Sequence, residues 1–78
     1  MTINNKYAVR AAAREMAGLR GELEEVSGKL HCAYRTFNCA LEDDLIYSSI
    51  YEINMLRARH TYLLRRIKQL TVPDEPPE

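Results

Sequence analysis

The sequence has few of the residues that hold very small proteins together. Its 78 residues include only two cysteines, three glycines and three prolines, and no tryptophan. Cys32 and Cys39 are separated by about two turns of a helix, which is too far for a disulfide within one helix. A chain of this length buries only about 60% of its unfolded surface, so oligomerisation is a common route to stability.

The sequence also lacks an excess of charge of one sign, a long apolar run and an apolar leader. Eleven Lys and Arg residues balance eleven Asp and Glu residues, so no global charge attracts nucleic acid or a membrane surface. No stretch approaches the length of a membrane span, and the first six residues lack the apolar run of a secretory signal. We therefore expect a cytoplasmic protein with reduced thiols and no membrane association.

The chain does have a regular 3-4 spacing of apolar residues. Its first half contains one such stripe: Val9, Ala12, Met16, Leu19, Leu23, Val26, Leu30, Ala33, Phe37 and Ala40. A second stripe follows a short polar stretch: Ile46, Ser49, Ile53, Leu56, His60, Leu63, Ile67 and Leu70. This spacing places each set on one side of a helix that needs a partner helix to cover it. The sequence predicts an all-α protein, an antiparallel two-helix hairpin.

The expected boundaries follow from charges and helix breakers. Acidic residues at 42–44 favour the start of a helix, where free N–H groups attract negative charge, and Pro73 ends it. The predicted organisation is a polar lead-in at 1–5, a hairpin at 6–70 and an acidic, Pro-rich disordered tail at 71–78. Within the hairpin we expect helix one at about 6–38, a turn at about 39–42 and helix two at about 43–70.

Three glycines leave the course of helix one open. Gly18, Gly21 and Gly28 lie off the apolar stripe, and each costs about 1 kcal/mol relative to Ala in a helix interior. Either the helix kinks near Gly18 to Gly21, or the small residues admit another helix to its back. We favour one helix with a weak point, because the stripe keeps its phase across the glycines. Matching the two stripes outward from the turn also predicts an ion pair between Glu25 and Arg57.

Three segments of the chain carry a resemblance to a known family. Residues 33–38 read Ala-Tyr-Arg-Thr-Phe-Asn, residues 43–51 read Asp-Asp-Leu-Ile-Tyr-Ser-Ser-Ile-Tyr, and residues 59–64 read Arg-His-Thr-Tyr-Leu-Leu. This pattern resembles the YaaL-like family of short proteins from spore-forming and related Firmicutes, a domain of unknown function. Two departures are His60, where the family tends to have Tyr, and an acidic residue where a Pro often follows the turn. The resemblance implies a bacterial protein without known catalytic residues. Genes of this family often lie beside a recombination-mediator gene, which weakly favours a role in nucleic-acid metabolism.

Candidate catalytic and metal-binding groups have simpler structural explanations. His60 can be a pH-sensitive or metal-binding imidazole, or an amphipathic ring packed at the seam between the helices, and we favour the second. His31, Cys32 and Cys39 could also bind zinc, but none of them has the spacing of a zinc motif, and we expect both cysteines opposite the seam. Without a phosphate loop, a nucleophile elbow or a closed cleft, we expect no enzymatic activity, catalytic residue, cofactor or metal.

Apolar residues outside the stripes predict an interface. Seven residues of helix two flank or oppose its stripe: Leu45, Tyr47, Ile50, Tyr51, Met55, Tyr62 and Leu64. A single hairpin cannot cover them all, and an uncovered apolar patch usually marks an interaction site. We therefore expect a homodimeric four-helix bundle that acts as a small interaction module, an adaptor or regulator with a protein partner in an unknown pathway.

The distribution of basic residues supports an alternative function. Five basic residues gather toward the end of helix two: Arg57, Arg59, Arg65, Arg66 and Lys68. Together with cations at the start of helix one, they could contact nucleic-acid phosphates at the open end of the hairpin. Acidic residues dilute this patch and no base-reading motif accompanies it, so ordinary solvation is the simpler explanation.

Overall fold

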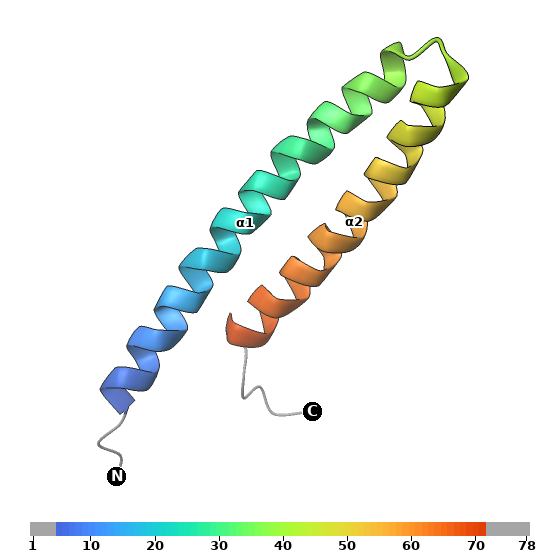
Figure 1. Ribbon diagram of the computed structural model, residues 1–78. Coiled ribbons are helices and arrows are strands. Elements are labelled where there is room, and N and C mark those ends of the chain that lie inside the picture. Colours follow the sequence, from blue (N-terminus) through green and yellow to red (C-terminus); the bar gives the residue numbers. More distant parts are fainter. Residues whose placement is uncertain (1–4, 72–78) are drawn as a thin grey trace.

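The computed structural model describes residues 5–71, which form two antiparallel helices joined by a short turn (Figure 1). Helix α1 spans Asn5–Cys39 and helix α2 spans Asp43–Thr71. The helices lie side by side along the length of α2. The predicted all-α hairpin is confirmed.

The helix boundaries lie within one residue of the expected ones. Asn5 belongs to α1 rather than to a lead-in, and Thr71 belongs to α2 rather than to a tail. At the turn, the backbone N–H of Ile46 donates to the carbonyl oxygen of Glu42 at 3.0 Å, which begins the hydrogen-bonded ladder of α2. The rest of the expected lead-in, 1–4, and of the expected acidic tail, 72–78, lies outside the described residues.

Helix α1 runs without a break through its three glycines (Figure 1). A Cβ atom added at Gly18, Gly21 or Gly28 would meet no atom within 4 Å. The glycines therefore border open space, and α2 does not approach the back of α1 through them. The stripe keeps its phase because one continuous helix carries it.

The core is a single seam formed where the two stripes meet. Its buried apolar residues are Val26, Ala33, Ile53, Leu56 and Leu63, with Leu19, Leu23 and Leu30 packed against them. Leu63 is 0% exposed, and Ser49 is the buried polar residue of the seam. All of these residues belong to the predicted stripes. So small a core agrees with the thin margin of stability expected for a chain of this length.

The N-terminal end of the α1 stripe does not enter the seam. Val9 is 65% exposed, and Ala12 is exposed as well. The reason is length, since α1 has 35 residues and α2 has only 29. Beside the turn, Phe37 is also more exposed than the stripe predicts. Val9 and Ala12 therefore remain largely uncovered by α2, and Phe37 is 37% exposed.

Candidate interaction surface

Two ion pairs cross between the helices on one face of the hairpin. Arg59 Nη2 donates to Glu22 Oε1 at 3.2 Å, and Arg66 pairs with Glu15. The partners recur every seven residues, about two helical turns, so the pairs lie in line along the seam. We call this side the charged face and define it by the two rows that flank the seam here: Glu15, Glu22, Lys29 and Thr36 on α1, and Leu45, Glu52, Arg59 and Arg66 on α2.

The opposite side of the hairpin is flanked by rows of different chemistry. We call it the neutral face and define it by Ala13, Arg20, Ser27 and Tyr34 on α1, and by Asp43, Ile50, Arg57, Leu64 and Thr71 on α2. Three of these nine residues are charged, compared with six of eight on the charged face. No ion pair is formed across the neutral face within residues 5–71.

A hollow of about 400 Å³ opens on the neutral face. It is lined by Leu30, Tyr34, Arg57, His60 and Thr61, and so brings the Tyr34 row of α1 beside the Arg57 row of α2. His60 is half-buried and contributes to both the seam and this hollow. Its position agrees with the favoured reading of an amphipathic ring packed at the seam. Sequence reasoning missed Tyr34, whose seven-residue spacing from Ser27 places it on this face.

The seven predicted interface residues are all exposed but do not form one patch. Ile50 and Leu64 lie on the neutral face, whereas Leu45 lies on the charged face. Tyr62 lies under Arg59, whose guanidinium carbon is 5.3 Å from the centre of the Tyr62 ring. Tyr51 points away from α1, since 100° per residue places it opposite the seam. The remaining two, Tyr47 and Met55, are among the most exposed apolar side chains of α2.

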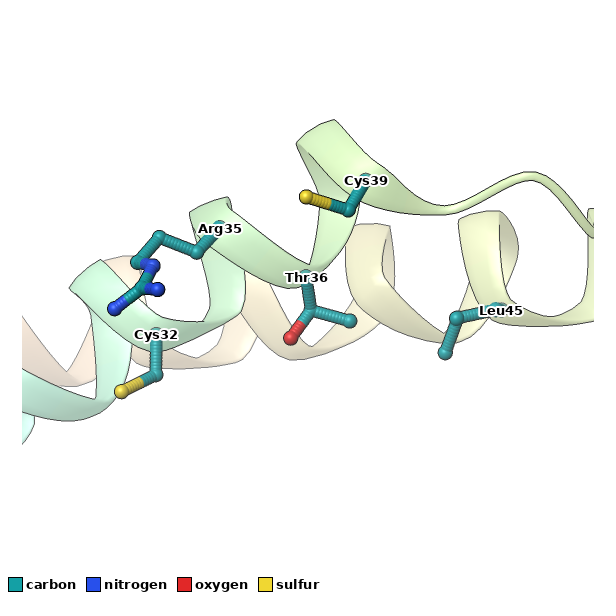
Figure 2. A pocket seen from close by; sticks show the side chains of 5 residues that line it. All are labelled: Cys32, Arg35, Thr36, Cys39 and Leu45. Atoms are coloured by element: carbon teal, nitrogen blue, oxygen red, sulfur yellow. The ribbon is translucent and has the colours of Figure 1, made fainter.

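The two cysteines line one hollow near the turn, so they share one side of α1, as helical spacing predicts. A hollow of about 440 Å³ near the turn is lined by Cys32, Arg35, Thr36 and Cys39 of α1 and by Leu45 of α2 (Figure 2). Both thiols are free and exposed. Their position opposite the seam stays a prediction, because the hollow is lined both by Arg35, which helical spacing places opposite the seam, and by Leu45 of α2.

The expected Glu25–Arg57 ion pair is wrong. Glu25 instead contacts Lys29 on its own helix, with Oε2 3.4 Å from Nζ. Arg57 lies on the neutral face beside His60. The two residues are at similar heights along the hairpin but on opposite sides of it, so their side chains cannot meet.

The five basic residues proposed for phosphate contact are dispersed around α2. Arg59 and Arg66 pair with glutamates of the charged face, and Arg57 lies on the neutral face. Helical spacing places Arg65 opposite the seam and Lys68 beyond the neutral face. The five do not share one side of the helix.

No cluster typical of a metal site exists among the described residues. Within residues 5–71, no three His, Cys, Asp or Glu side chains lie close enough together to hold a metal ion. Neither α1 nor α2 contains an apolar stretch sufficient to cross a bilayer.

No family model, curated protein or solved structure matches this chain. The resemblance to the YaaL-like family therefore remains a prediction.

Proposed function

We propose that this chain is a small cytoplasmic protein-interaction module, an adaptor or regulator of another bacterial protein, which works as a homodimeric four-helix bundle. The observation that carries the proposal is the neutral face. Its exposed apolar side chains, Tyr34, Ile50 and Leu64, flank a seam with only five buried apolar residues. A second layer of helices would bury these side chains and enlarge a core that is small for an independent domain.

The composition of the neutral face supports an interface rather than ordinary solvent exposure. Interface centres are depleted in charged residues and enriched in aromatic residues and Arg. The neutral face has one aromatic residue, Tyr34, and its charges are Arg20, Arg57 and, at the start of α2, Asp43. Exposed apolar residues scattered singly need no explanation, but a row bordering the seam on both helices does.

Binding of nucleic acid has less support as the function. Phosphate contact requires cations that are free and point the same way. Two of the five candidate cations, Arg59 and Arg66, already pair with glutamates of α1. A fluorescence titration against duplex and single-stranded DNA at low salt tests this alternative, and we expect no binding.

The proposed function is tested by measuring mass in solution and capture from the bacterial host. Light scattering at micromolar concentration should give twice the 9.0 kDa mass of the chain. A tagged chain should retain a host protein that a Leu64→Glu variant loses and a Tyr51→Glu variant keeps. The control introduces the same residue, Glu, on the side of α2 away from the seam. A folded monomer that captures nothing would contradict the proposal.

A further inference from the structure

We infer that a second copy of this chain covers the neutral face with its own neutral face, and that the two hairpins run antiparallel, each turn lying beside the open end of the other. The inference rests on the proposed function and adds the surface and the orientation. We infer a second copy as the partner because the neutral face has the area of a stable interface. The charge along the hairpin and the positions of the apolar residues of α2 are also complementary between two copies.

The neutral face is large enough for a stable dimer. The 29 residues of α2 extend for about 43 Å at 1.5 Å per residue, and two adjacent helices are about 20 Å wide. The face therefore offers about 860 Å², close to the roughly 800 Å² that each partner buries in a standard interface. Tyr34, Ile50 and Leu64 are distributed along this length rather than confined to one end.

The charged face is a poor alternative for the same role. Covering it would remove six charged side chains of each copy from water: Glu15, Glu22, Lys29, Glu52, Arg59 and Arg66. Burial of ion pairs costs several kcal/mol per ion before any attraction is recovered. On the neutral face three charged side chains of each copy would lose water: Arg20, Asp43 and Arg57.

The charge along the hairpin selects the antiparallel orientation. The turn half, residues 27–56, has four acidic and two basic side chains, a net charge of −2. The open half, residues 5–26 and 57–71, has nine basic and four acidic side chains, a net charge of +5. Antiparallel copies bring each acidic turn beside a basic open end, whereas parallel copies would place like charges together.

The apolar residues of α2 are arranged symmetrically for this orientation. The middle residue of α2, which spans Asp43–Thr71, is Arg57. Ile50 and Leu64 each lie seven residues from it. A two-fold axis beside Arg57 therefore sets Ile50 of one copy level with Leu64 of the second copy, and the reverse. The same axis brings the two Arg57 side chains near each other, which is the one unfavourable contact of the arrangement.

Paired leucine variants test which face is covered. Leu64 on the neutral face is 47% exposed and Leu45 on the charged face is 43% exposed, so Leu45→Glu is a matched control for Leu64→Glu. By sedimentation, Leu64→Glu should weaken the dimer at least 100-fold, and Leu45→Glu should change it less than threefold. Arg57→Leu should strengthen the dimer about tenfold, which is about 1.4 kcal/mol. Far-UV circular dichroism establishes that each variant keeps its helices.

The reverse result would overturn the inference and leave the proposed function standing. If Leu45→Glu separates the copies and Leu64→Glu does not, the second copy covers the charged face. If the wild-type chain is a folded monomer at 100 μM, the inference fails and so does the homodimer of the proposed function, while capture of a host protein can still be measured.

A spin label at the turn tests the orientation. Leu41 lies in the turn and is 92% exposed, so Leu41→Cys in a Cys32→Ser, Cys39→Ser background places one label there on each copy. In the antiparallel dimer the two labels lie about 40 Å or more apart, the length of α2. In a parallel dimer they lie within about 25 Å, because only the width of adjacent helices separates them. A distance in the longer range supports the antiparallel arrangement, and one in the shorter range overturns it.

Discussion

The charged and neutral faces are formed by the same two helices and follow the same seven-residue spacing, yet they have opposite chemistry. On the charged face, glutamates of α1 meet arginines of α2. On the neutral face, Arg57 and His60 of α2 border a hollow with Leu30 and Tyr34 of α1. Both faces flank one seam, so the difference cannot come from the packing of that seam. The charged face is suited to water, and the neutral face is the side on which we propose a second layer.

Exposure alone does not distinguish these faces. Leu45 and Leu64 are exposed to nearly the same extent, although one neighbours rows of charge and the other does not. The exposed ion pairs contribute at most about 1 kcal/mol each to stability. Their larger effect is on assembly. Burying ion pairs costs free energy, so they disfavour a second apolar layer on the charged face. We therefore expect an interface on the side of the hairpin that has fewer charges.

The largest expected effect comes from removing the seam on which both faces depend. Leu63→Ala deletes a fully buried side chain and should lower the free energy of unfolding by about 2–5 kcal/mol. Met55→Ala, at a position 61% exposed on the same helix, should change it by less than about 0.5 kcal/mol. Urea unfolding followed by circular dichroism compares the two. A loss below 1 kcal/mol for Leu63→Ala would mean that the seam is not the main source of stability.

Substitutions on the outer side of α1, which belongs to neither face, should stabilise the protein rather than destabilise it. Gly21→Ala and Gly28→Ala add a Cβ where no atom lies within 4 Å, so each should stabilise the chain by about 1 kcal/mol through helix propensity. Thermal and urea unfolding measure the gain. Destabilisation of the assembled protein, together with weaker association, would show that a partner packs against these glycines and that the neutral face is not the main interface.

The smallest effect is expected on the charged face itself. Glu22→Arg places a cation beside Arg59 and should lower stability by about 0.2–1 kcal/mol, while the double variant Glu22→Arg, Arg59→Glu should restore it. The same change at the exposed residue Glu24, which has no ion-pair partner among the described residues, serves as a control. The loss should shrink in 1 M salt, since salt screens exposed pairs. A loss that is independent of salt would point to packing rather than charge.

Much of the fold could be predicted because periodicity and helix ends are local properties of a sequence. The stripes gave the seam from Leu19 to Leu63, and the acidic start of α2 gave its boundary. Periodicity gave the wrong answer at Val9 because it contains no information on where the partner helix ends. The exposed position of Val9 follows from the difference in length between α1 and α2.

The surface was harder to predict because height along the seam and side of the seam are separate questions. Matching the stripes placed Glu25 and Arg57 at similar heights, but their sides differ, and Glu25 contacts Lys29 instead. The stripes also could not separate Leu45 on the charged face from Leu64 on the neutral face, because they do not tell on which side of the seam a flanking residue lies. Once the Glu22–Arg59 pair identifies the charged face, the seven-residue spacing assigns every other residue that flanks the seam to one of the two faces.

The short turn also determines the order in which the hairpin can form. Thr36 and Leu45, which border one hollow, are close in sequence, whereas Glu22 and Arg59 are 37 residues apart and Glu15 and Arg66 are 51 apart. Closing a loop costs more entropy as the loop lengthens, so contacts near the turn are the least costly to make first. We expect contacts between the helices to form first at the turn and then successively along the seam, with those at the open end forming last. Ion pairs at that end should then slow unfolding while leaving the folding rate almost unchanged.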